Sequence, residues 1–180
     1  PHYGEGAAGE KALAHYIEEL CHAHGAHEAN GAHGANEAKD VNKANGANWE
    51  HEAYKANKAN GAHRVHGGQG EGLTVRRQAV LPGRENVIIE LRTGRPNPTL
   101  LFEAHMDTVS LGNMRNPLTP IIRDGRLYGR GACDTKSSLA AMLYTMFECA
   151  KRLDQMSCDL VMCAAVDEEH EYRGLSKWME

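Results

Sequence analysis

Residues 100–109 read LLFEAHMDTV, and this stretch decides the fold that we expect for the chain. Thr99 to Ala104 is a short, largely apolar run between Pro98 and a loop, which predicts a buried strand. His105 and Asp107 lie two residues apart, so an extended backbone would direct both side chains to the same face. An imidazole binds a metal through one ring nitrogen, while a neighbouring carboxylate fixes its tautomer. The stretch therefore predicts a strand that carries a histidine and an aspartate to a metal site.

Two later stretches carry further potential metal ligands. Residues 129–136 read GRGACDTK, and residues 166–171 read VDEEHE after an apolar run at 160–165. Each stretch places carboxylates just past a strand or a strand-like turn. Because such points converge at the carboxyl ends of the strands in an α/β sheet, we expect them to meet the first stretch at one edge.

Together, the three motifs resemble a family of zinc-dependent amidohydrolases and exopeptidases. This family includes acetylornithine deacetylase, succinyl-diaminopimelate desuccinylase, aminoacylase and glutamate carboxypeptidase. The motifs are HMDTV at 105–109, GRGACDTK at 129–136 and DEE at 167–169, in that order, and their combination is far more specific than any one of them. The resemblance covers roughly residues 73–180, with weaker support from Gly9 to Leu20. It implies an α/β fold, a mixed sheet flanked by helices, and the first part of a zinc exopeptidase-like catalytic domain.

The resemblance also implies a role for each motif residue. His105, Asp134 and Glu169 would be metal ligands, with Asp134 bridging two zinc ions and Glu169 binding the second one; Co²⁺ is a possible substitute. Glu168 would stay unligated and act as general base toward a water activated by the metal. Asp107 would orient His105 and raise its basicity. The expected reaction is hydrolysis of an amide bond in a small N-acyl amino acid or a dipeptide-like substrate.

Three further expectations follow from the resemblance. The peptide bond between Asp134 and Thr135 is expected to be cis, and the Cys133 side chain is expected to pack away from the metal. The remaining ligands of the family, a carboxylate and a terminal histidine, and a lid domain that often forms a homodimer, would lie beyond Glu180. We therefore expect weak metal binding and little or no turnover from this chain alone.

Taken one at a time, the same residues also have structural interpretations. A lone histidine such as His105 is more often a partly buried structural residue, and a run of acids is more often a solvated loop. Asp134 alone could cap the helix that follows it. The metal-site interpretation is favoured by the occurrence of all three motifs in family order.

Composition excludes several classes of function. The chain has 180 residues, enough for one domain with a core, and its net charge of −4 favours neither a nucleic-acid partner nor a membrane surface. We find no apolar segment of membrane-spanning length and no signal-peptide pattern. The five cysteines are scattered and form no Cys-x-x-Cys pair, which favours a reduced, cytoplasmic protein.

Hydrophobic periodicity predicts the elements around the motifs. Glu10 to Leu20 has an apolar stripe with helical spacing, and the Asp-Gly pair at 124–125 is typical of a tight hairpin turn. The expected helices are 10–20, 137–153 and 174–179, and the expected strands are 73–81, 86–91, 99–104, 158–165 and the two arms of a hairpin at 121–128.

Residues 22–66 are a low-complexity segment with triplets such as Gly-Ala-His and Lys-Ala-Asn. It has few large apolar residues, so we expect 22–72 to be a disordered insertion between a first helix at 1–21 and the catalytic part at 73–180. Three interpretations remain open: a translated tandem repeat without a role, a stacked solenoid, and a metal-sequestering segment that uses its histidines. The alternative function is accordingly a non-catalytic fragment whose His-rich segment sequesters metal.

Overall fold

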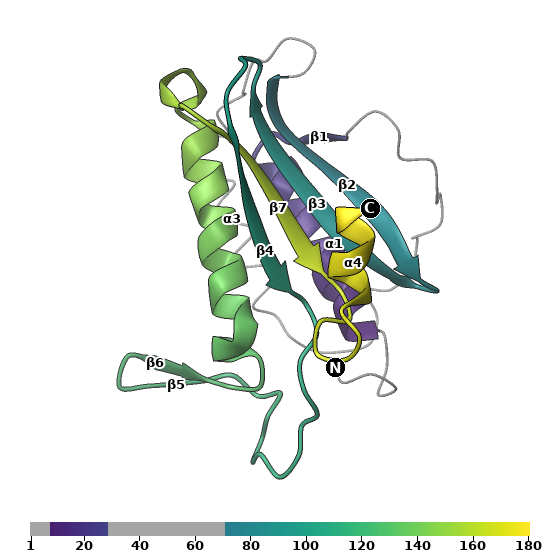
Figure 1. Ribbon diagram of the computed structural model, residues 1–180. Coiled ribbons are helices and arrows are strands. Elements are labelled where there is room, and N and C mark those ends of the chain that lie inside the picture. The colour runs from purple at the N-terminus through teal and green to yellow at the C-terminus, as the bar shows by residue number, and fades with distance from the viewer. Residues whose placement is uncertain (1–7, 29–70) are drawn as a thin grey trace.

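The computed structural model describes residues 8–28 and 71–180 (Figure 1). Its helices and strands, in chain order, are α1 (Ala8–Ala23), β1 (His27–Glu28), β2 (Glu71–Leu81), β3 (Arg84–Thr93), β4 (Thr99–His105), β5 (Ile121–Arg123), β6 (Arg126–Tyr128), η1 (Ala132–Lys136), α3 (Ser137–Ala150), η2 (Leu153–Gln155), β7 (Asp159–Ala165) and α4 (Arg173–Met179).

Five of these strands form one mixed sheet in the order β1-β2-β3-β7-β4. β2 pairs antiparallel with β3, and β3 pairs antiparallel with β7. β4 pairs parallel with β7, and this pairing sets Ala104 opposite Ala164 and His105 opposite Ala165. All seven residues of β7 are buried, which is typical of a strand covered on both faces. The carboxyl ends of β4 and β7 therefore lie side by side at one edge of the sheet.

Helices cover both faces of this sheet. One core cluster joins α1 and α3 to alternate residues of β3 and β7; its members include Ile17, Leu143, Met146, Ile89 and Met162. The other face has a smaller cluster of Ile88, Val161, Cys163 and Ala165, against which Trp178 of α4 packs. Figure 1 shows the same arrangement, with α4 across the sheet from α1. The predicted mixed α/β architecture is confirmed.

The first helix, α1, extends past both ends of the predicted helix at 10–20. Its first turn carries Glu10, buried in an ion pair with Arg84, and its last turn carries the fully buried Cys21. Residues 22–28, which we assigned to the low-complexity segment, form the last turn of α1, a turn at Gly25 with φ 88° and the short strand β1. Residues 71–72, at its other end, already belong to β2. The remainder of the segment, including most of its histidines, lies outside the described residues.

A predicted helix keeps its type but ends early, and a predicted hairpin keeps both its type and its bounds. The helix expected at 137–153 ends at Ala150 and is followed by η2. The hairpin at 121–128 is confirmed as β5 and β6, and both turn residues, Asp124 and Gly125, have positive φ, 52° and 72°, as such a turn requires. None of the helices in the two described ranges has the length and apolar character needed to cross a membrane.

Candidate metal centre

The candidate metal centre lies where β4 and β7 end together. The amide of Met106 donates to the carbonyl of Ala165 at 2.7 Å, so the sheet pairing continues one residue past β4. Beyond that point the two strands lead into separate loops, one carrying Asp107 and the other carrying Glu168 and Glu169. The parallel pairing is the reason why residues so distant in sequence meet at this edge.

His105 is the centre of the group and is buried, with 7% of its surface exposed. Its Nε2 atom lies 3.2 Å from Oδ1 of Asp134 and 3.7 Å from Oε2 of Glu168. Its Nδ1 atom lies 3.1 Å from the carbonyl oxygen of Asp107 and 3.4 Å from Oδ1 of the same residue. One ring nitrogen thus faces the Asp107 side, while the other faces two carboxylates from other loops.

Asp107 joins the two loops as well as contacting the imidazole. It is buried, and its two carboxylate oxygens accept hydrogen bonds from the amides of Glu168, at 3.3 Å, and Glu169, at 3.1 Å. Burial would raise the pKa of Asp107, but the hydrogen bonds from His105 and from the Glu169 amide outweigh it, so the pKa lies below its usual value. Asp107 therefore holds His105 and the acidic loop in one geometry.

Asp134 reaches the imidazole from η1, the irregular turn before α3. Its side chain is 79% exposed, and its φ and ψ of −109° and 99° are not helical. The peptide bond from Asp134 to Thr135 is cis, as predicted. The alternative role as a helix cap is not observed, since α3 begins after Lys136 without a side-chain cap.

Lys136 ties this turn to the end of β4. Its Nζ atom donates to the carbonyl of Met106 at 3.0 Å. Gly131, with φ 80°, leaves the space that this lysine needs: a Cβ there would lie 2.9 Å from Cγ2 of Thr108 and 3.0 Å from Nζ of Lys136. The GRGACDTK motif therefore folds into a turn whose glycine and lysine hold Asp134 beside His105.

The donor set fits a divalent metal ion. His105, Glu168 and Glu169 each offer one ligand atom, and these atoms lie within 4.8 Å of one another. Asp134 is outside that group but close to the same imidazole nitrogen. One imidazole with several carboxylates is a ligand set that zinc accepts. Of the three predicted ligands, His105 and Glu169 fall in this group and Asp134 lies beside His105, while Glu168, the predicted base, also belongs to the group.

The titratable groups of the centre influence one another. The hydrogen bond to Asp107 raises the pKa of His105 to about 9, against the opposing effect of burial and with a further contribution from Asp134. Burial raises the pKa of Glu168, and the nearby Glu169, Asp107 and Asp134 add to that effect, while His105 opposes it. A raised pKa is the direction that favours proton acceptance by a carboxylate acting as general base.

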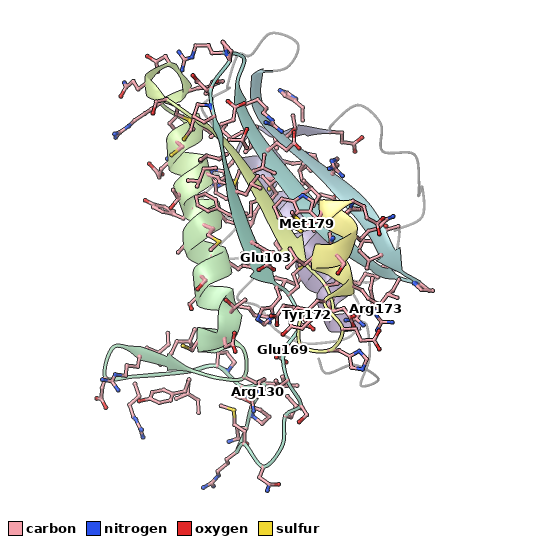
Figure 2. All side chains as sticks on the ribbon, in the orientation of Figure 1. Glu103, Arg130, Glu169, Tyr172, Arg173 and Met179 are labelled. Carbon is pink, nitrogen blue, oxygen red and sulfur yellow. The ribbon has the colours of Figure 1, made fainter. Side chains whose placement is uncertain are left out.

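Sequence reasoning missed two groups beside the centre. Asp167, inside the DEE motif, is fully buried and pairs with Arg84 and Arg173. Glu103 lies two residues before His105 on β4, and its Oε1 atom is buried without a hydrogen-bond partner in the described part of the chain. Figure 2 labels Glu103 on β4 and shows Glu169, Tyr172 and Arg173 around the loop between β7 and α4. An acid within an otherwise apolar strand was the only sequence signal for Glu103.

Part of this chain is similar in sequence to known proteins. Residues 101–180 match the model of Peptidase family M20/M25/M40. The matched part contains His105, Asp107, Asp134, Glu168 and Glu169, and the recognition from sequence is therefore confirmed at the level of the family.

Curated relatives of this M20 segment include succinyl-diaminopimelate desuccinylases. The protein from Delftia acidovorans is 38% identical over 81 residues, which is 43% of this chain and 21% of the relative. The one from Acinetobacter baylyi is 48% identical over 56 residues, 29% of this chain and 15% of the relative. A peptidase M20 domain-containing protein of Schizosaccharomyces pombe is 34% identical over 111 residues, 59% of this chain and 26% of the relative. The chain thus spans about a fifth of the length of the desuccinylases.

A solved structure supports the fold. The crystal structure of human carnosine dipeptidase 1 matches with a TM-score of 0.51 and 21% identity, over 59% of this chain and 25% of that chain. The similarity to this structure concerns the fold, that is, the arrangement of the sheet and its helices.

Proposed function

We propose that this chain supplies a metal-binding part of an M20-type metallohydrolase that cleaves an amide bond. The observation that carries the proposal is the position of His105 Nε2, 3.2 Å from Asp134 and 3.7 Å from Glu168, with Glu169 in the same group. Because the chain spans about a fifth of the length of the desuccinylases, hydrolysis is proposed for the enzyme that contains this segment.

In this proposal, His105, Asp134 and Glu169 hold the ion, and Zn²⁺ is the metal that best suits their chemistry, with two ions per complete site and Co²⁺ as a substitute. A bound ion would supply Lewis acidity toward the amide carbonyl and would lower the pKa of a nearby water. Glu168, whose pKa is raised, accepts the proton of that water and returns it to the leaving amine. Asp107 fixes the imidazole so that Nε2 faces the carboxylates.

The proposed substrates are N-acyl amino acids or dipeptide-like molecules. The support comes from the similar proteins, which are named as desuccinylases of an acylated amino acid and as a dipeptidase. We assign the reaction to the reducing environment of the cytoplasm, where the five free cysteines would remain thiols. This matters most for the cysteines at 133, 149 and 158, which are exposed or partly exposed.

A metal titration tests the proposal. We expect metal-free protein to bind Co²⁺ or Zn²⁺ in calorimetry, and His105→Ala to weaken binding by at least about tenfold, since an imidazole ligand is lost. His15→Ala is the matched control, because His15 is an exposed histidine on α1, 59% exposed, and its removal leaves the centre intact. Equal binding by wild type and His105→Ala would contradict the proposal.

The alternative, a metal-sequestering His-rich segment, is tested by the same titration. Two of its histidines have structural partners: His22 lies 3.1 Å from the carbonyl of Ala26, and His24 stacks on Phe147 with ring centroids 4.1 Å apart. The variant for this arm replaces by glutamine the histidines at 33, 51, 63 and 66, which lie outside the described residues. Binding that survives His105→Ala but disappears in this variant would favour sequestration.

A further inference from the structure

The loop that carries Glu168 and Glu169 follows a fully buried aspartate, Asp167. We propose that Asp167 belongs to a charge cluster, formed with Glu10, Arg84 and Arg173, that positions this acidic loop for metal binding. The inference rests on the proposed function, because the four side chains of the cluster would hold the two proposed metal-site glutamates in place. The four cluster members are positioning residues, since they act through the backbone of the loop.

The four members of the charge cluster come from four separate places in the fold. Glu10 lies in the first turn of α1, Arg84 begins β3, Asp167 follows β7 and Arg173 begins α4. Arg84 contacts Glu10 through Nε and, at 2.8 Å, through Nη2, and it contacts Oδ1 of Asp167 at 3.0 Å through Nη1. Arg173 contacts Asp167 at 2.6 Å through Nε and at 3.3 Å through Nη2.

Three of the four charged side chains are buried, so the loss of an ion pair among them would be costly. Glu10 and Asp167 are 2% and 0% exposed, and Arg84 is 8% exposed. A buried carboxylate is costly unless it is paired and hydrogen-bonded, so Asp167 needs both guanidinium groups. Arg173 is 31% exposed and also lies 3.4 Å from Glu171, so the buried part of the cluster is Glu10, Arg84 and Asp167. Removal of the Asp167 charge takes away the carboxylate that Arg84 and Arg173 both contact.

The charge cluster also fixes the backbone of the loop. The amide of Asp167 donates to Glu10 at 3.4 Å, and its carbonyl accepts from the amide of Tyr172 at 2.9 Å, which closes the loop on itself. Asp167 has a φ of 66°, a conformation that aspartate and asparagine adopt more readily than other residues with side chains. The next two residues are Glu168 and Glu169, whose amides bind Asp107. The acidic loop is thus held from one side by Asp107 and from the other by the cluster.

A buried acid of similar kind at the other end of β7 provides a matched control. Asp159 is 8% exposed, accepts hydrogen bonds from the amide and hydroxyl of Thr93 at 2.9 and 2.8 Å, and lies 3.5 Å from Arg92. It is the first residue of β7, whereas the acidic loop follows the last one. Asp159→Asn therefore removes a buried, arginine-paired charge from the same strand without touching the acidic loop.

The first arm of the test is hydrogen exchange on the metal-free full chain. Asp167→Asn keeps the size and the backbone preference of the residue and removes its charge. We expect the amides of residues 168–172 to exchange at least about tenfold faster than in wild type, while β3 amides stay protected. Glu10→Gln, which lies outside the loop and also removes one charge, is expected to act in the same direction. Asp159→Asn is expected to leave residues 168–172 as in wild type.

The second arm is Co²⁺ affinity, followed by visible absorption of the same proteins below their unfolding temperatures. We expect Asp167→Asn to weaken Co²⁺ binding by about 10- to 100-fold and to change the absorption spectrum, as is usual when the support of a ligand is lost. Asp159→Asn is expected to bind Co²⁺ as wild type does, even where it lowers the unfolding temperature.

The outcomes separate this inference from the proposed function. Loop exchange in Asp167→Asn and Glu10→Gln that equals that of Asp159→Asn overturns the charge cluster as a positioning device. The same conclusion follows if exchange rises but Co²⁺ affinity through His105 is unchanged. If wild-type protein binds no Co²⁺, or binds it undiminished in His105→Ala, the proposed function fails, and the exchange arm still decides whether the cluster holds the loop.

Discussion

His105 lies between two sets of acids that act on it differently. Asp107 contacts the Nδ1 side from the following loop turn, while Asp134 and Glu168 approach Nε2 from elsewhere in the chain. In the metal-free protein these carboxylates favour the protonated imidazole and raise the pKa of His105 to about 9. A metal ion needs the neutral imidazole, so the ion and the proton compete for the same nitrogen.

The raised pKa of His105 predicts a pH dependence of stability for the metal-free protein. The pKa of His105 is raised above its ordinary value of 6.5, so the folded state holds the proton more tightly than the unfolded state. The resulting stabilisation is fully present below pH 6.5 and is lost as the pH rises through about 9. Urea unfolding in the presence of a chelator, together with NMR titration of His105, measures both effects.

Asp107→Asn is the informative variant for this titration, because Asp107 makes the largest contribution to the raised pKa. We expect the variant to bring the pKa of His105 back toward 6.5 and to flatten the pH dependence of unfolding. A wild-type His105 that titrates near 6.5 in the metal-free protein would show that the three acids do not surround it as described.

At the scale of elements, the loop between β7 and α4 is built by close backbone contacts. Asn86 of β3 is fully buried; it donates to the carbonyl of Gly174 at 2.8 Å and accepts from the amide of Val166 at 3.0 Å. The amide of Gly174 donates to the carbonyl of Val166 at 3.2 Å. The two ends of the loop are therefore joined directly, with no space for a side chain at Gly174.

Gly174→Ala is predicted to disrupt this junction. A Cβ at this position would lie 2.2 Å from the carbonyl oxygen of Val166 and 2.7 Å from Oδ1 of Asn86, so the backbone must move. We expect a loss of about 1–3 kcal/mol in the free energy of unfolding and weaker Co²⁺ binding, since the acidic loop moves with the junction. Denaturant unfolding and a Co²⁺ titration measure the two effects.

Gly129→Ala is the control for this substitution. The nearest atom to a Cβ at Gly129 is the carbonyl oxygen of Pro117 at 3.6 Å, an ordinary contact, and Gly129 has no positive φ. A Gly174→Ala protein as stable as Gly129→Ala would mean that the two ends of the loop are not in contact.

Much of this arrangement was predictable from the sequence, for identifiable reasons. Apolar runs that end in acids predicted β4 and β7, and the motif order predicted which residues meet at their ends. The charge cluster was not predictable, because Glu10 is read from sequence as a polar position in an amphipathic helix. Only the tertiary fold brings it to Arg84 and Asp167. The short strand β1 was not predicted either, because it exists only through its pairing with β2, which lies far away in the sequence.

At the scale of the molecule, α1 and residues 71–180 share one core. Ile17 of α1 is 1% exposed and packs in the same cluster as residues of β3, β7 and α3. The first helix therefore supports the sheet that presents the metal centre, although residues 29–70 separate the two in sequence.

Ile17→Ala tests this shared core. We expect a loss of about 2–5 kcal/mol in the free energy of unfolding, the usual range for such a core truncation. Urea unfolding followed by circular dichroism provides the measurement. Glu19→Ala, at a position 62% exposed on the same helix, is expected to change stability by less than about 0.5 kcal/mol. Equal effects of the two substitutions would show that α1 is not packed on the sheet.

The central claim is that a divalent ion is held by one imidazole and several carboxylates at the ends of β4 and β7. X-ray absorption at the zinc edge of the protein loaded with one equivalent of Zn²⁺ tests it most directly. We predict a shell of nitrogen and oxygen atoms at about 2.0–2.2 Å that contains a single imidazole, and the loss of this imidazole signal in His105→Ala. A shell with a sulfur atom at about 2.3 Å, or with two or more imidazoles that persist in His105→Ala, would contradict the account.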